Sequence, residues 1–167
     1  APEDFMLRPT LANDSQTGWL LSIALVFVLL AGPALADGHA KGVDPNIKYR
    51  QSLMEIIGTN MGAIGDIMKN QLDLPGAIAN HAGQMAEAAA LIGPAFKKDI
   101  SKGPTDAKPE IWKDWAKFEK AADETRTATA VFAEAVTSGD ADKIGTAFKG
   151  VGDSCKGCHK EFRQKDD

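Results

Sequence analysis

Apolar residues recur with a helical period along the segment that follows Asp44-Pro45. Their steps of three and four residues place them on one face of a helix: Leu53, Met54, Ile57, Met61, Ile64 and Met68. Asp44 is a typical N-cap, and Pro45 suits the first helical position because an N–H there would have no intrahelical partner. The pattern predicts a helix over residues 45–70.

Three further segments show helical periodicity. The second covers residues 75–96 and contains Gly93-Pro94, which we expect to kink or end the helix. The third covers residues 109–139 and the fourth residues 140–164, each with residues typical of helix ends at its borders. No segment shows strand-like alternation. The fold class that we predict for residues 44–167 is therefore all-α, an antiparallel four-helix bundle.

An uncharged apolar run occupies residues 19–36 and, as a helix, would reach about 27 Å, enough to cross a bilayer. It also resembles a secretory signal, because Ala34-Leu35-Ala36 fits an A-x-A cleavage site. Residues 1–18 are long and polar for a signal peptide, which favours a retained transmembrane anchor joined to the bundle by a linker over residues 37–43. The alternative is a soluble periplasmic protein cleaved after Ala36.

Composition limits the function classes. The 167 residues carry a net charge of −4, and 44% of them are hydrophobic, as expected for one globular domain with extended ends. The sequence pI of about 5.4 gives no electrostatic reason to bind nucleic acid, whose protein partners usually carry a basic face. We therefore exclude nucleic-acid binding.

The strongest chemical signal is Cys155-Lys156-Gly157-Cys158-His159 near the C-terminus. C-x-x-C-H is the attachment motif of c-type haem: the two thiols add to the vinyl groups of the porphyrin, and the histidine binds the iron as proximal ligand. A thioredoxin-like site would need a neighbouring βαβ pattern, which is absent from the sequence. A structural zinc site would need two more ligands, for which only His39 and His81 remain.

The stretches around this motif resemble a known family. CKGCHKEFR at residues 155–163, YRQSLM at residues 49–54 and KPEIWKDWAKFE at residues 108–119 are similar to the class II cytochromes c, the cytochrome c′ and c-556 group. The resemblance covers about residues 44–165 and leaves out the apolar run. It implies a four-helix bundle that carries one covalently bound haem c.

The resemblance also implies roles for single residues. Arg50 corresponds to an arginine near a haem propionate, with which a guanidinium can pair. Met54, one turn later, faces the distal side of the iron; we expect it to be the sixth ligand, the alternative being that it only fills the pocket. Further haem-pocket residues implied are Met61, which is also an alternative ligand, Trp112, Phe162 and Arg163.

Two functions follow from the two roles of Met54. If Met54 and His159 both bind iron, no coordination position is open. The protein is then expected to be no enzyme but an electron carrier, anchored in the bacterial inner membrane with its haem in the periplasm. Its expected partners are a quinol:cytochrome c oxidoreductase, a terminal oxidase or a photosynthetic reaction centre, with a homodimer possible. The alternative is a five-coordinate haem that binds NO or CO on a face lined by Met54, Ile57 and Gly58.

Overall fold

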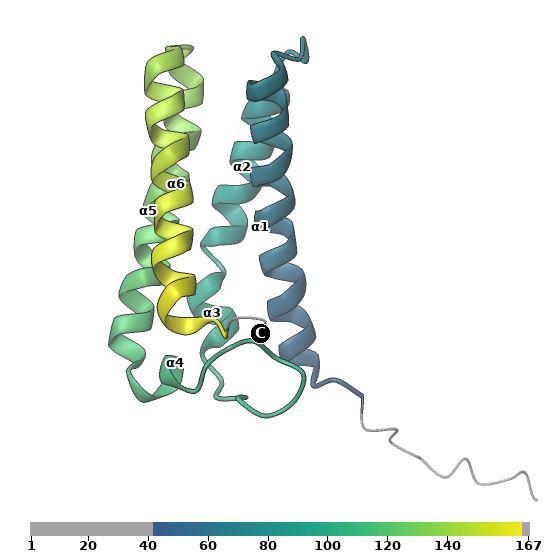
Figure 1. The fold of residues 1–167 in the computed structure, drawn as a ribbon, viewed down its shortest axis with the longest axis vertical. Helices are drawn as coiled ribbons and strands as arrows, with labels where there is room; N and C mark the ends of the chain where they lie inside the picture. The colour runs from purple at the N-terminus through teal and green to yellow at the C-terminus, as the bar shows by residue number, and fades with distance from the viewer. Residues whose placement is uncertain (1–41, 165–167) are drawn as a thin grey trace, which may run out of the picture. The chain divides into compact units, whose positions relative to one another are not determined.

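The computed structural model describes residues 42–164, which are helical apart from loops and one isolated β-bridge. The described residues form four long helices and two short ones. The long helices run up and down as an antiparallel bundle, and the short ones lie in the connections (Figure 1). In chain order they are α1 (Pro45–Asn70), α2 (Ala77–Ala89), α3 (Ile92–Phe96), α4 (Glu110–Lys113), α5 (Trp115–Ser138) and α6 (Ala141–Phe162). The predicted all-α four-helix bundle is confirmed for these residues.

Helix α1 begins and ends where the sequence predicts. The Asp44 side chain accepts a hydrogen bond from the Asn46 backbone N–H at 2.8 Å, and Pro45 is the first helical residue. At the other end Gln71 adopts a left-handed conformation, with φ of 51°, and its N–H donates to the Ile67 carbonyl. Both ends are thus closed by local interactions.

The second predicted helix is divided into α2 and α3, and the break lies before Gly93-Pro94 rather than at it. A proline ring collides with the carbonyl four residues earlier, here that of Ala90, and it also removes one N–H donor. Ala90 and Leu91 separate the two helices, and the Leu91 N–H donates to the Ala88 carbonyl three residues back.

The third predicted helix is also divided, into α4 and α5, at Asp114. Asp114 leaves the helical region, with φ of −128° and ψ of 67°, and its side chain accepts from the Lys117 N–H at 3.2 Å. A short acidic side chain competes in this way with the helical backbone bond. The predicted stop and start after α5 are correct, because Gly139 is left-handed, with φ of 68°, and Asp140 caps α6.

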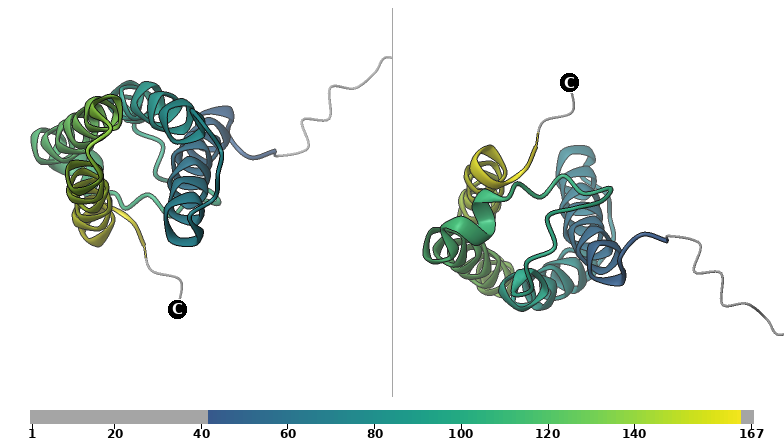
Figure 2. Two further views of the ribbon diagram at one scale, coloured as in Figure 1. Left: turned by 90° about the horizontal axis from the view of Figure 1, so that it is seen from above. Right: turned by 90° about the horizontal axis from the view of Figure 1, so that it is seen from below.

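Each long helix packs on the long helix that follows it in the chain. Helix α1 packs on α2, α2 on α5, and α5 on α6, as the views along the axis show (Figure 2). Fully buried side chains from the four helices, Ile64, Met85, Phe132 and Val151, form the centre of the core. Among the long helices that are neighbours around the bundle, α1 and α6 are the pair whose backbones do not pack closely, and this side of the bundle carries the site described below.

The predicted anchor over residues 19–36 lies outside the described residues, as do the polar segment 1–18 and most of the linker. Within residues 42–164 no helix is both long enough and apolar enough to cross a membrane.

Candidate functional site

Both cysteines of the motif lie on α6, one turn apart, with their side chains half-buried against the core. No disulfide joins them. Burial raises the pKa of Cys155 and, together with the charges of Cys155, Glu124 and Glu161, raises the pKa of Cys158 to about 11. The thiols therefore keep their protons at neutral pH. Addition of an S–H across a vinyl group uses that hydrogen as well as the sulfur.

His159 follows Cys158 on the last turn of α6. Desolvation, and secondly the charge of Arg163, lower the pKa of its imidazole. The neutral form is the one that binds metals, so the surroundings favour the ligand form of this side chain. One Arg163 guanidinium nitrogen lies 3.4 Å from a carboxylate oxygen of Asp106, which holds the arginine at the end of α6.

In the middle turns of α1 and α6, long side chains span the gap between the two helices and end beside glycines. A Cβ atom on Gly65 would lie 3.8 Å from Cζ of Phe148, and one on Gly152 would lie 3.6 Å from Cε of Met61. These two pairs define an antiparallel register between the helices. In each pair one helix contributes a glycine against which the partner's bulky side chain packs.

The same register, continued by three and then four residues, brings the remaining site residues level with each other. Gly58 of α1 is level with Cys155 of α6, and Met54 is level with His159. Residues spaced by three and four lie on one helix face. The register thus pairs the predicted distal residue with the predicted proximal one across the α1–α6 side.

The residues on this side fit a c-type haem. On α1 a Cβ atom added to the exposed Gly58, one turn beyond Met54, would meet no atom within 4 Å. The two thiols and the imidazole that the group requires stand in sequence on α6. Met54 and Met61 are half-buried on the facing helix. The roles of Met54 and Met61 toward iron stay predictions.

Arg50 is buried, with 3% of its surface exposed, and within residues 42–164 it has no carboxylate partner within hydrogen-bond distance. Instead its guanidinium donates to three backbone carbonyls, those of Ala95 (3.0 Å), Ile100 (3.0 Å) and Lys98. A guanidinium has five N–H donors. Two therefore remain, and the pairing of Arg50 with a haem propionate stays a prediction.

The predicted pocket aromatics belong to a cluster at the same end of the bundle. The Trp112 ring lies 5.0 Å from the Arg50 guanidinium carbon, and its indole N–H donates to the Phe96 carbonyl at 2.8 Å. Phe162 is buried and packs edge-on against Phe118, with ring centroids 5.3 Å apart. Ile57, expected on the distal face, is buried in the core. Its side chain points to the bundle interior because it continues the apolar stripe of α1.

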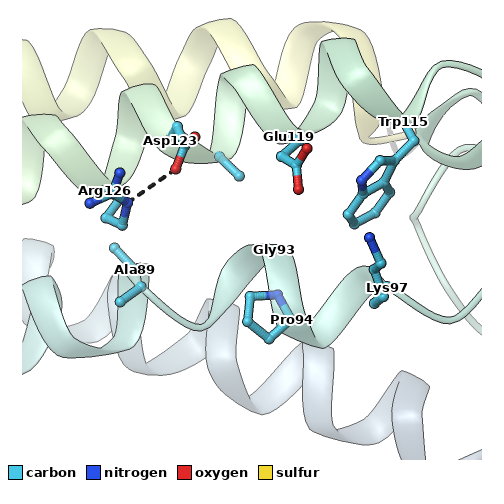
Figure 3. A pocket seen from close by; sticks show the side chains of 10 residues that line it. Ala89, Gly93, Pro94, Lys97, Trp115, Glu119, Asp123 and Arg126 are labelled. Carbon is cyan, nitrogen blue, oxygen red and sulfur yellow. Dashed lines mark hydrogen bonds and ion pairs between the residues drawn. The ribbon is translucent and has the colours of Figure 1, made fainter.

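A separate pocket of about 310 Å³ lies between α2, α3 and α5 (Figure 3). It is lined by two cations and two anions, of which Arg126 and Asp123 form an ion pair at 3.1 Å. Lys97 lies over the Trp115 ring at 4.8 Å. None of the predicted haem residues lines this pocket, so it is distinct from the α1–α6 side.

Two features of the described structure had no signal in the sequence. The buried Asn60 faces His81, with Oδ1 and Nδ1 2.7 Å apart, although Asn60 lies within the apolar stripe of α1. Residues 106–108 pair with the end of α6 through an isolated bridge between Ala107 and Arg163. Both contacts join segments far apart in the chain, which no local pattern indicates.

The alternative metal and redox sites have no support in residues 42–164. No three histidine, cysteine, aspartate or glutamate side chains in that range gather as metal ligands would. No strand is present there to form the βαβ unit of a thioredoxin-like site. His39, which a zinc site would also need, lies outside the described residues.

A four-helix bundle whose last helix carries C-x-x-C-H is typical of the four-helix class of c-type haem proteins. A family model described as cytochrome C′ matches residues 45–163. The chain belongs to the cytochrome c′ family and carries a covalently attached c-type haem.

Relatives and solved structures agree with this assignment. The cytochrome c′ of Rhodospirillum rubrum is 34% identical over 127 residues, covering 74% of this chain and 86% of the relative. The structure of cytochrome c prime from Shewanella frigidimarina is 30% identical with a TM-score of 0.67, covering 72% of this chain and 94% of that one. Variants of cytochrome c prime from Alcaligenes xylosoxidans, 33% identical with a TM-score of 0.65 and the same coverage, have been solved with nitric oxide and with carbon monoxide.

These findings correct the first of the two functions inferred from the sequence. The membrane-anchored electron carrier with a His/Met-ligated haem is wrong, because the relatives from Rhodospirillum rubrum and Alcaligenes are named cytochrome c′, and the Alcaligenes protein has been solved in complex with diatomic gases. The physical reason is coordination. A gas molecule needs an open or readily opened iron position, whereas a carrier of that type keeps both axial positions filled by the protein.

Proposed function

We propose that this protein is a periplasmic cytochrome c′-like haem protein that binds nitric oxide or carbon monoxide. Cys155 and Cys158 hold the haem and His159 is its proximal ligand. The observation that carries the proposal is the attachment motif on α6, with the half-buried Met54 of α1 level with His159 across the α1–α6 side. The gas complexes of the related Alcaligenes protein support it.

The distal side of the proposed site suits a small uncharged ligand. Ferrous haem, when bound, supplies the iron that the gas binds. Met54 presents a thioether, which is weakly polar and carries no proton to donate, and Gly58 leaves room one turn further along α1. We assign Met54 the role of filling this pocket. No distal acid–base pair is assigned, so the proposal is binding rather than turnover.

Absorption spectra of the purified reduced protein, with and without carbon monoxide, test this proposal. We expect a high-spin spectrum that carbon monoxide changes strongly. Met54→Ala should bind carbon monoxide faster than the wild type, because it removes the side chain that a ligand must displace. Met68→Ala is the matched control, since Met68 is a half-buried methionine two turns beyond Met61 on the same helix.

A sharp low-spin reduced spectrum that carbon monoxide leaves unchanged would contradict the proposal. If Met54→Ala then created gas binding, Met54 would be an iron ligand, as the sequence first suggested. If Met61→Ala created it instead, the ligand would be Met61. Each outcome therefore assigns one role to one methionine.

The periplasmic location rests on chemistry, because c-type haem is attached outside the bacterial cytoplasm. Osmotic-shock release of the haem-bearing protein from cells tests it. A homodimer is a further proposal: on α1, Tyr49 and Ile56 are about half exposed, 50% and 48%, and lie two turns apart on one outward face. Light scattering of the wild type and of Ile56→Glu tests whether that face pairs two copies.

A further inference from the structure

The segment between α3 and α4, residues 97–109, crosses the end of the bundle where α1 begins and α6 ends (Figure 1). We call this segment the strap. It contains no long helix of its own, yet hydrogen bonds hold it to both of the helices that carry the proposed haem ligands.

The first attachment is to α1 and depends on Arg50. The guanidinium donates to the carbonyls of Lys98 and Ile100 in the strap and of Ala95 just before it. The cation also lies 4.9 Å from the Phe96 ring centroid, on the last residue of α3. Because the fork is planar and its donors are fixed, these bonds set the position of the strap against α1.

Two more contacts extend this attachment along α1. The Gln51 side-chain amide donates to the Pro104 carbonyl at 3.0 Å. Gly103, with φ of 120°, lies so close to α1 that an added Cβ would stand 3.1 Å from Cδ1 of Ile47. Only glycine combines this conformation with this approach.

The second attachment is to the end of α6, directly after the haem motif. The Lys108 N–H donates to the Phe162 carbonyl at 2.9 Å, and the Gln164 N–H donates to the Asp106 carbonyl at 2.7 Å. The Asp106–Arg163 ion pair lies between these two bonds. A single residue, Thr105, separates this attachment from Pro104 of the first.

We propose that the strap sets the spacing of α1 and α6 at the level of Met54 and His159, and that Arg50 and Gly103 are positioning residues for the distal side. The helices contact each other through Gly152–Met61 and Gly65–Phe148, about two and about three turns further along the bundle. Toward the strap end, hydrogen bonds through the strap link α1 to α6. This inference rests on the proposed gas binding, whose rate it governs.

The test loosens the strap without touching a haem residue. Gly103→Ala introduces a methyl group at a residue of positive φ and places it against Ile47. The control is Gly139→Ala at the α5–α6 turn, which has the same unfavourable positive φ but no atom within 4 Å of the added methyl group. The association rate of carbon monoxide with the reduced holoprotein is measured for both variants. We expect a rise of about tenfold for Gly103→Ala, which equals ~1.4 kcal/mol of barrier, and a rate close to wild type for Gly139→Ala.

Hydrogen exchange of the Arg163 N–H, bonded to the His159 carbonyl at 3.0 Å, is measured in the same samples. We expect faster exchange in Gly103→Ala than in Gly139→Ala. Two results overturn the proposal that the strap sets the spacing of α1 and α6: equal exchange in the two variants, or faster exchange in Gly103→Ala with an unchanged carbon monoxide association rate. If Gly103→Ala does not fold, Gln51→Ala replaces it, because Gln51 is exposed and contributes one strap bond.

The wild type separates failure of this inference from failure of the proposed function. If the wild type binds no carbon monoxide, the proposed function fails on its own. The exchange comparison then decides the strap: faster exchange at Arg163 in Gly103→Ala supports the link from α1 to α6, and equal exchange refutes it. If Gly103 only stabilised the fold, Gly103→Ala and Gly139→Ala would change the carbon monoxide association rate and the exchange of the Arg163 N–H by equal amounts.

Discussion

Replacing Arg50 by methionine tests how much the attachment of the strap to α1 contributes to the free energy of unfolding. Methionine keeps an apolar stem but removes all three carbonyl bonds and both aromatic contacts of the cation. The Lys98 carbonyl belongs to an exposed residue and can regain water, whereas Ala95 and Ile100 are partly buried. Two poorly hydrated carbonyls at about 1–3 kcal/mol each, with two cation–π contacts of about 0.5–1 kcal/mol, give a gross loss of about 3–8 kcal/mol.

Part of that loss is offset, because the variant no longer buries a charge that lacks a carboxylate partner. We therefore expect Arg50→Met to lower the free energy of unfolding by about 3–5 kcal/mol. Urea unfolding of the holoprotein, followed by far-ultraviolet circular dichroism, measures this as a lower midpoint at an unchanged slope. Arg50→Lys should lower the free energy of unfolding by less than Arg50→Met does, because lysine keeps a cation over the aromatic rings. It still lowers it, because lysine lacks the planar guanidinium that donates to the three carbonyls.

Arg126→Met is the matched control, since Arg126 is half exposed and pairs with a single carboxylate. Surface pairs of this kind contribute about 0–1 kcal/mol. The reasoning is refuted if Arg50→Met lowers the free energy of unfolding by less than about 1 kcal/mol, the same as Arg126→Met. The three hydrogen bonds of Arg50 would then contribute too little to hold the strap on α1.

Three further predictions concern the core, a helix end and the haem attachment. Phe132→Ala should lower the free energy of unfolding by about 3–5 kcal/mol in urea, since Phe132 is fully buried against Phe148; a loss under about 1 kcal/mol would show that the site refills. Hydrogen bonds from Lys143 and Asp142 hold the pKa of Asp140 below its usual value, so this cap stabilises α6 at neutral pH and is lost as the pH falls through that lowered pKa. The urea midpoints of wild type and Asp140→Ala should therefore differ at neutral pH and converge near pH 2; a constant difference would contradict the capping role. Replacing Cys155 and Cys158 together by serine should make the haem extractable by acidic organic solvent, whereas extraction from the wild type would exclude covalent attachment.

Sequence alone predicted the features that depend on neighbouring residues. The borders of α1 follow from a capping aspartate, a proline and an apolar stripe, all within 27 residues of chain. The attachment motif could be identified for the same reason, because its thiols and imidazole occupy one stretch of α6. The breaks at Ala90 and Asp114 were local as well, but each depends on a competition between side chain and backbone that periodicity does not resolve.

Only the tertiary structure decided how distant segments meet. The carbonyl partners of Arg50 lie 45 to 50 residues away, and the residues that pair with the end of α6 lie more than 50 residues before it. The sequence could name Met54 and His159 as candidates on two helices but could not determine their register or spacing. Those quantities depend on glycine contacts between α1 and α6 and on the strap, because the separation of two helices is a property of their packing and not of either helix alone.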